Sequence, residues 1–338
     1  MQQHDIIVIG SSAGGVKALK TLVKSFSINI EASIFVVQHV SPHAQSLLPE
    51  ILTSAGPLKA AHAVDGEIIE KAKIYIAPPD HHMIISEGRI LVKKGPRENR
   101  FRPSIDALMR SAAYEYGERV IGIVLTGMLD DGTSGLWSVN RLGGITIIQN
   151  PEDALYPDMP RNVLEFVDVS YNVPLSEIGM IVNDLVRQPV PVSNPVDIEI
   201  LCKMETEIKV AAQQNALANG ILELGEKTSM TCPECGGAMT GFTEGKAVRF
   251  RCHTGHGFTS GFLLAEILET VESKLWQSLR SMEEAIILLE QSADQYRKSL
   301  DDIHAQHTGL KAARIRNRAV KLLDFIYEEG QLEDLDTD

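Results

Sequence analysis

Apolar positions in the first 190 residues fall into short continuous runs, with amphipathic stretches between them. The runs are rich in β-branched residues and lie at Asp5–Ile9, Ser33–Val37, Lys73–Ala77, Val120–Leu125 and Ile145–Ile148. Runs of this length that alternate with helical periodicity are typical of parallel strands buried in a sheet that is covered on both faces. The pattern therefore predicts an α/β fold with a doubly wound, mainly parallel, Rossmann-like sheet.

Local signals add helices and a hairpin to this sheet domain. Helical patterns follow the first strand as far as Val23, begin again near Pro42, and run from Pro103 to about Tyr114. Two further apolar runs, Met83–Ile85 and Ile90–Val92, flank a turn that contains glycine, which predicts a β-hairpin.

The character of the chain changes after Asp184. Three prolines within the eight residues Gln188–Pro195 indicate an extended linker, and a helix-prone stretch follows over 198–224. We therefore expect four parts: a sheet domain, a linker with a helical segment, a small Cys/Gly-rich module, and a helical region with an acidic tail. Their expected bounds are 1–188, 189–230, 231–260 and 261–338.

Apolar residues from Leu264 to Ile303 are separated by threes and fours, which predicts a long helix or coiled coil. A second helix is expected from about Leu310 to Tyr327. The two helices could pack on each other as a hairpin, or they could mediate self-association or partner docking. The acidic residues that crowd the end of the chain predict a solvated tail; they are Glu328, Glu329, Glu333, Asp334, Asp336 and Asp338.

Composition narrows the class of protein. The net charge of −13 argues against a dedicated nucleic-acid binder, because phosphate neutralisation requires clustered Lys and Arg. The N-terminus lacks the pattern of a secretory signal, and no apolar run approaches the roughly 18 residues that span a bilayer. We therefore expect a cytoplasmic protein.

Three polar groups are expected at one edge of the sheet. Ser12 follows the first strand, His39 ends the second, and the segment LTGMLDDGTSG, with Asp130 and Asp131, follows the strand Val120–Leu125. Ligands of doubly wound sheets bind outside the carboxyl ends of the strands, so a hydroxyl, an imidazole and a carboxylate would meet there. This is the set that acyl transfer by a Ser-His-Asp triad requires. Taken singly, each residue also fits a helix cap, a satisfied polar group or a turn.

The glycine-rich segment Gly10–Gly15 does not match a known nucleotide or hydrolase motif. It is neither G-x-G-x-x-G nor a P-loop, since no Gly-Lys-Ser/Thr follows, and it is not the G-x-S-x-G elbow of α/β-hydrolases.

Several motifs in order carry a specific resemblance. GSSAGG, QHVSP, IAPPDHHM, FRPSIDALMRSAA, LTGMLDDG and PDMPRN, within residues 3–188, resemble the catalytic domain of chemotaxis protein-glutamate methylesterase, the CheB family. The resemblance implies hydrolysis of glutamate γ-methyl esters on methyl-accepting chemotaxis receptors, and deamidation of receptor glutamines by the same chemistry. It implies Ser12 as the nucleophile, His39 as the general base, Asp131 as the residue that orients the histidine, and the backbone N–H of Met128 as an oxyanion donor. No cofactor is implied for catalysis.

The chain departs from the family pattern at two positions near the site. Leu129 stands where the family usually has Gly, and Ala13 stands where Ser or Thr often follows the nucleophile. Asp130 competes with Asp131 for the carboxylate role, and Ser11 is a weaker alternative nucleophile. Members of the family often carry an N-terminal receiver domain; because the first strand begins within a few residues of Met1, we expect none here, with regulation in trans or through the C-terminal extension.

Three of the four cysteines cluster in that extension. Cys232-x2-Cys235 and Cys252-x3-His256 have the spacing of a tetrahedral zinc ribbon, so we expect a structural zinc held by these four residues. His253 is an alternative fourth ligand, and a metal-free module with reduced thiols is the alternative to zinc. Cys202 lies apart and is expected to be a buried apolar residue.

Two other functions remain open beside the receptor methylesterase. The sheet domain could be a non-catalytic scaffold that binds receptors, or the same triad could hydrolyse other esters. A triad reports the class of reaction and leaves the acyl donor undefined.

Overall fold

The computed structural model describes residues 2–43, 46–191 and 197–329. It divides into two compact units, Met1–Leu263 and Leu264–Asp338. The boundaries expected between the four parts of the chain, at residues 188, 230 and 260, stay predictions. The linker predicted over Gln188–Pro195 lies partly outside the described residues, as do the last nine residues of the acidic tail.

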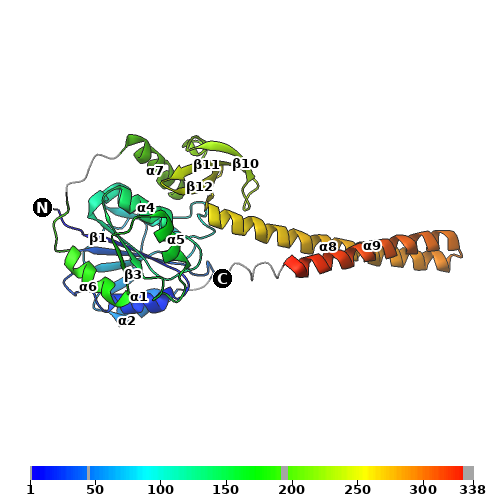
Figure 1. Cartoon of the computed structure of the whole chain (residues 1–338), viewed down its shortest axis with the longest axis horizontal. Helices are drawn as coiled ribbons and strands as arrows, with labels where there is room; N and C mark the ends of the chain where they lie inside the picture. The colour runs from blue at the N-terminus through cyan, green and yellow to red at the C-terminus, as the bar shows by residue number, and fades with distance from the viewer. Residues whose placement is uncertain (1, 44–45, 192–196, 330–338) are drawn as a thin grey trace. The chain divides into compact units, whose positions relative to one another are not determined.

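A seven-stranded sheet forms the centre of the first unit, with helices around it (Figure 1). Its strand order is β3-β4-β2-β1-β7-β8-β9, and all neighbouring strands pair in parallel. The strands are β1 (Ile6–Ser11), β2 (Ser33–Gln38), β3 (Lys59–His62), β4 (Lys73–Ile76), β7 (Val120–Val124), β8 (Ile145–Gln149) and β9 (Tyr171–Val173). Every residue of β1, β2 and β7 is buried, as expected for central strands covered on both faces. The predicted doubly wound fold is therefore confirmed.

Helices cover both faces of this sheet. One apolar core lies under α3 (Ile105–Tyr116), α4 (Thr133–Arg141) and α5 (Asp158–Phe166). The other lies under α1 (Gly15–Val23), α2 (Leu48–Ala55) and α6 (Leu175–Leu185). The expected β-hairpin is formed by β5 (His82–Ser86) and β6 (Arg89–Lys93), and η1 (Gly117–Arg119) precedes β7. The helix expected near Pro42 begins later, at Leu48.

The strand order reverses at β1, whose neighbours are β2 and β7. Connections from β1 and β7 therefore leave the sheet toward opposite faces, and the carboxyl ends of these two strands mark the edge at which doubly wound sheets bind their ligands. The loops after β1, β2 and β7 carry Ser12, His39 and Asp131 to this edge.

A second, antiparallel sheet belongs to the same compact unit. After α7 (Ile198–Ala211) and η2 (Ile221–Glu223), its strands are β10 (Glu226–Thr231), β11 (Ala238–Glu244), β12 (Ala247–Cys252) and β13 (Gly257–Thr259). We refer to residues 198–263, from α7 to the first residues of α8, as the clamp segment. Its core is small and includes Phe250, Phe258 and Phe262.

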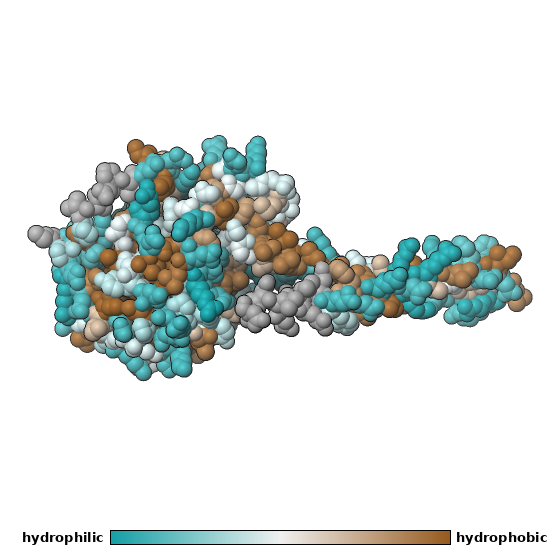
Figure 2. Space-filling model, in the orientation of Figure 1, coloured by the Kyte–Doolittle hydropathy of each residue, from teal (hydrophilic) through white to brown (hydrophobic). Residues whose placement is uncertain are grey.

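The second unit is a helical hairpin of α8 (Ser260–Lys298) and α9 (Asp302–Glu329), in which Leu279 and Ile286 pack with Ala319 and Ile326. The single helix predicted through Ile303 is wrong at its end. The chain reverses at Leu300, which has a φ of 61° and is 90% exposed. The apolar spacing continues across this turn, and Figure 2 shows apolar side chains exposed at the tip of the hairpin. Among the described residues, no helix combines the length and apolar character needed to cross a bilayer.

Candidate active site and Cys/His cluster

Ser12, His39 and Asp131 form a continuous hydrogen-bonded relay. The Oγ of Ser12 lies 3.1 Å from Nδ1 of His39, and Nε2 of His39 lies 2.8 Å from Oδ2 of Asp131. With Nε2–H donating to the carboxylate, Nδ1 carries the lone pair that accepts the serine hydroxyl proton. The structure thus brings together the three residues singled out in the sequence, in the order that nucleophilic catalysis requires.

Gln38 holds the backbone on which the serine and histidine stand. Its Nε2 donates to the carbonyl oxygens of Ser12 at 2.8 Å and His39 at 2.9 Å, and its Oε1 accepts from Ser11 Oγ at 2.8 Å. Ser11 is fully buried and its hydroxyl is engaged, whereas Ser12 is half-buried. A Cβ at Gly15 would lie 2.1 Å from Gln38 Oε1, so this close approach requires glycine.

The His39 ring stacks on Phe101, with ring centroids 3.7 Å apart and planes 8° apart. Only 4% of the histidine side chain is exposed. The stack and the two hydrogen bonds together fix both the plane of the imidazole and its rotation within that plane.

The N-terminus of α3 holds the Asp131 carboxylate. Oδ2 accepts from the backbone N–H of Ile105 at 2.8 Å, and Oδ1 accepts from Ser104 Oγ at 3.0 Å and from the N–H of Asp106 at 3.3 Å. Free N–H groups and the helix dipole favour an anion at this position. Burial alone would raise the pKa of Asp131, but the contacts with His39 and Ile105 lower it below the ordinary value. Asp131 is therefore a carboxylate, as the orienting role needs.

A second buried carboxyl, Asp106, shares a partner with Asp131. Nδ2 of Asn99 donates to Asp106 Oδ2 at 3.0 Å and to Asp131 Oδ1 at 3.2 Å. Burial, followed by the charges of Asp131 and Glu98, raises the pKa of Asp106 well above its usual range. Because the pKa of Asp131 is lowered and that of Asp106 is raised, the negative charge of the pair lies on Asp131, the carboxyl beside His39.

Asp130, the competing carboxylate, points elsewhere. Its Oδ1 accepts from Thr259 Oγ1 at 2.8 Å, and the side chain is 9% exposed. Burial raises the pKa of Asp130 to about 6, against the lowering effect of the Thr259 hydrogen bond.

The loop after β7 brings Gly127, the residue before Met128, against the serine. A Cβ on Gly127 would lie 2.9 Å from Ser12 Cβ and 1.9 Å from Met159 Sδ, so only glycine fits between them. Leu129 has a φ of 61°, the left-handed conformation that favours glycine. Its carbonyl oxygen accepts a hydrogen bond from Asn162 at 2.9 Å, which fixes the loop from the other side.

Asn99, Phe101, Ser104 and Gln38 were not identified as site residues from the sequence. Ser104 lies within the motif FRPSIDALMRSAA and Gln38 within QHVSP, so the motifs marked the right segments without giving their roles. Phe101 is the first residue of the same FRPSIDALMRSAA motif, whereas Asn99 lies outside the motifs and its partners are distant in the chain.

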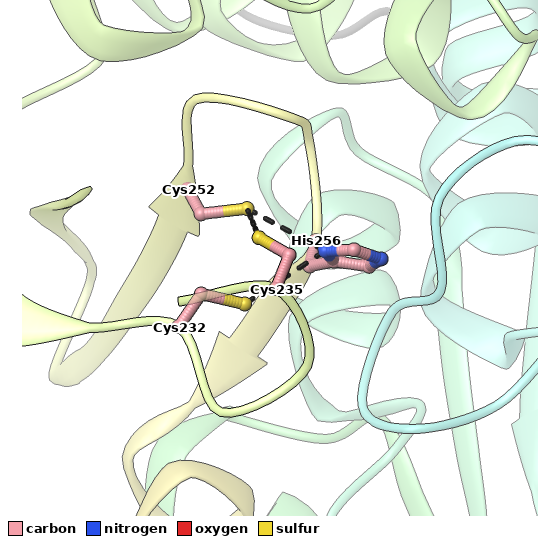
Figure 3. Close-up of side chains that lie close together, drawn as sticks. All are labelled: Cys232, Cys235, Cys252 and His256. Carbon is pink, nitrogen blue, oxygen red and sulfur yellow. Dashed lines mark hydrogen bonds between the residues drawn. The ribbon is translucent and has the colours of Figure 1, made fainter. Parts of the chain in front are cut away.

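Cys232, Cys235, Cys252 and His256 form a compact donor cluster, with all four ligand atoms within 4.8 Å of one another (Figure 3). Cys232 Sγ and Cys252 Sγ lie 3.7 and 3.6 Å from His256 Nδ1, and Cys235 Sγ lies 3.7 Å from Cys252 Sγ. In a tetrahedron with zinc–sulfur bonds of about 2.3 Å and zinc–nitrogen bonds of about 2.0 Å, neighbouring ligand atoms are roughly 3.5–3.8 Å apart. The donors therefore fit zinc in both chemistry and spacing.

Two expectations about neighbouring residues have different outcomes. His253 lies against Gly237 and is outside the four-donor cluster. The expectation that Cys202 is buried is wrong. Its side chain is exposed on α7 because that helix directs Met204, Glu207 and Val210 inward.

Comparison with known proteins gives the family of the sheet domain. Residues 7–182 match the family model of the CheB methylesterase. A putative protein-glutamate methylesterase/protein-glutamine glutaminase of Leptospira interrogans serogroup Icterohaemorrhagiae serovar copenhageni (strain Fiocruz L1-130) is 34% identical over 177 residues, 52% of this chain and 92% of that protein. Protein-glutamate methylesterase/protein-glutamine glutaminase 2 of Methanosarcina mazei is 33% identical over 192 residues, 54% of this chain and 52% of that protein.

A solved structure agrees as well. The CheB methylesterase catalytic domain of Thermotoga maritima superposes with a TM-score of 0.52 at 34% identity, over 54% of this chain and 98% of that domain. The family model covers more than half of the sequence, and the solved catalytic domain shares the fold of the sheet domain. This chain belongs to the CheB methylesterase family.

Proposed function

We propose that the protein hydrolyses glutamate γ-methyl esters on methyl-accepting chemotaxis receptors, releasing methanol. The observation that carries the proposal is the Ser12–His39–Asp131 relay, with its 3.1 and 2.8 Å contacts at the edge of the sheet. The names of the relatives, which describe methylesterases and glutaminases, support the choice of substrate.

The chemistry follows from the positions of the three residues. Ser12 Oγ attacks the ester carbonyl carbon while Nδ1 of His39 takes the hydroxyl proton. The resulting imidazolium is stabilised by the Asp131 carboxylate, which stays ionised because α3 and His39 lower its pKa. His39 then protonates the leaving methoxide, and a water molecule, deprotonated by the same nitrogen, hydrolyses the acyl-serine.

The oxyanion of the tetrahedral intermediate needs donors close to Ser12. We assign the backbone N–H of Met128 to this role, since Gly127 packs directly against the serine. One such donor contributes about 10²–10³ in rate. Replacing methanol by ammonia as the leaving group gives receptor glutamine deamidation by the same steps.

The Cys/His cluster is assigned a structural zinc. Four protein donors leave no open coordination position, so a bound zinc would stabilise the fold of β10–β13 without taking part in ester hydrolysis.

Release of methanol from methyl-labelled receptor membranes tests the proposal. We expect Ser12→Ala to lower turnover by about 10⁴–10⁶ without loss of fold. Ser54→Ala, which removes an exposed serine hydroxyl on α2, is the matched control and should retain full activity.

A fluorophosphonate probe separates the alternatives. Labelling of Ser12 without methanol release would indicate an esterase for other substrates. Absence of both would indicate a non-catalytic scaffold. Near wild-type methanol release by Ser12→Ala would refute the assignment of the nucleophile.

A further inference from the structure

The catalytic histidine is linked to the clamp segment by a pair of aromatic contacts. Phe101 stacks on His39 at 3.7 Å, and it also packs edge-to-face against Phe262, at a centroid distance of 5.9 Å and an angle of 81°. Phe262 is fully buried in the core of the clamp segment. Phe101 is therefore held between the imidazole and residues that lie more than 150 positions later in the chain.

The catalytic aspartate is linked to the clamp segment by hydrogen bonds. Asn99 donates to Asp131 through Nδ2, while its Oδ1 accepts from the backbone N–H of Thr259 at 3.0 Å and its own N–H donates to the carbonyl of Gly257 at 2.8 Å. Asn99 is fully buried with a φ of 51°, a left-handed conformation that needs such partners to hold it. Strand β13 supplies two of them.

The loop that carries Asp131 contacts the same strand. Asp130 accepts a hydrogen bond from Thr259 Oγ1, and Leu129 packs against the apolar core that contains Phe258 and Phe262. The left-handed backbone at Leu129 costs roughly 1–2 kcal/mol relative to glycine. Packing against the clamp segment gives the leucine side chain a favourable contact that glycine lacks.

A buried ion-pair network fixes the clamp segment in this position. Arg110 and Glu98 of the sheet domain meet Glu207 of α7 and Arg249 and Arg251 of β12, and each of these side chains is at most 2% exposed. Breaking such a buried set costs several kcal/mol, so the segment is held rigidly.

We propose that the clamp segment positions the catalytic pair. Phe262 acts on His39 through Phe101, and β13 acts on Asp131 through Asn99 and through the hydrogen bond from Thr259 to Asp130, the neighbour of Asp131. Phe101, Asn99, Thr259 and Phe262 are thus positioning residues. The inference rests on the proposed function for the identity of the reaction. The geometry on which it depends, the His39–Asp131 hydrogen bond, can be measured without any substrate.

The test compares full-length wild type with Phe262→Leu, which stays apolar but loses the aromatic edge. Phe242→Leu is the matched control, because Phe242 belongs to a separate cluster of the same segment. We expect Phe262→Leu to lower kcat for methyl-ester hydrolysis about tenfold with less than about a twofold change in KM, since small displacements of a catalytic group act on the chemical step. It should also shift the low-field proton resonance of the His39 ring N–H, whereas Phe242→Leu should change neither.

A second pair of variants guards against misfolding. Thr259→Val removes the hydroxyl that donates a hydrogen bond to Asp130, and Thr259→Ser restores that donor. The serine variant should recover both the resonance and kcat. An unchanged His39 resonance in both Phe262→Leu and Thr259→Val would overturn the inference. A shifted resonance in a protein that releases no methanol would refute the proposed function while supporting the positioning role.

Discussion

Asp130 offers a quantitative test of the electrostatics around the active site. Burial raises the pKa of its carboxyl to about 6, from an ordinary 3.8, with Asp131 adding to the rise and Thr259 and Arg249 opposing it. A folded-state pKa above the unfolded value means that the folded protein binds the proton more tightly. Stability is therefore lost as pH rises from about 4 through 6, because ionisation is easier in the unfolded chain.

The magnitude follows from the two pKa values. Since a tenfold change in a proton equilibrium is worth about 1.4 kcal/mol, the ionised form of Asp130 costs about 3 kcal/mol above pH 7. Asp130→Asn removes the titration and keeps an oxygen that can accept from Thr259. We expect the free energy of unfolding of this variant, relative to wild type, to increase by about 2–3 kcal/mol between pH 4 and pH 8.

Urea unfolding at a series of pH values, with fluorescence and circular dichroism, measures this difference. Any constant cost of the asparagine amide cancels, because only the change with pH is compared. Asp184→Asn, which replaces an exposed carboxylate of α6, is the control for the loss of a surface charge. A difference for Asp130→Asn that stays flat from pH 4 to 8, or falls, would refute the proposed burial of an ionisable group.

Three further outcomes are expected. Gly127→Ala should lower kcat more than about tenfold in the methanol-release assay, because the new Cβ would lie 1.9 Å from Met159 Sδ and 2.9 Å from Ser12 Cβ. Gly309→Ala, where the new Cβ meets no atom within 4 Å, should leave kcat unchanged. In urea unfolding, Glu207→Gln should lose about 3–5 kcal/mol, because the buried network of three arginines and three glutamates is left with one uncompensated positive charge. Glu205→Gln, at a partly exposed position of the same helix, should lose less than about 0.5 kcal/mol. Elemental analysis should find about one zinc per chain, which is lost in Cys235→Ser and retained in Cys202→Ser. Retention of zinc in Cys235→Ser would contradict the assigned site.

The sheet and the three catalytic candidates could be predicted because their signals are local. Five apolar runs of β-branched residues gave five central strands to within about two residues, and a strand end in a parallel sheet fixes where the next side chain lies. The Cys/His set was predictable for the same reason, since a metal site with two close pairs has a characteristic spacing.

Other features depend on contacts between distant residues. Strands β10–β13 are short and rich in polar residues, and their alternation is weak, so the sequence indicated a cysteine module without its sheet. The chain reversal at Leu300 was not predicted, because the apolar spacing continues through it. Cys202 was predicted to be buried, but α7 directs Glu207 inward and leaves Cys202 exposed. A buried glutamate is unexpected until its arginine partners are known.

The buried ion pairs explain why α7 and the antiparallel sheet should be regarded as one element. Glu98 and Arg110 of the sheet domain neutralise each other, with Arg110 Nη2 2.6 Å from Glu98 Oε1. Helix α7 contributes one buried negative charge, Glu207, whereas β11 and β12 contribute Glu244 with Arg249 and Arg251, an excess of one positive charge. Neither part could dock alone without burying an unpaired charge, which costs several kcal/mol. When α7 and the antiparallel sheet dock together, their buried charges sum to zero. Residues 198–263 are therefore expected to associate with the sheet domain as one unit, and to contact Asn99 and Phe101 only when both parts are docked.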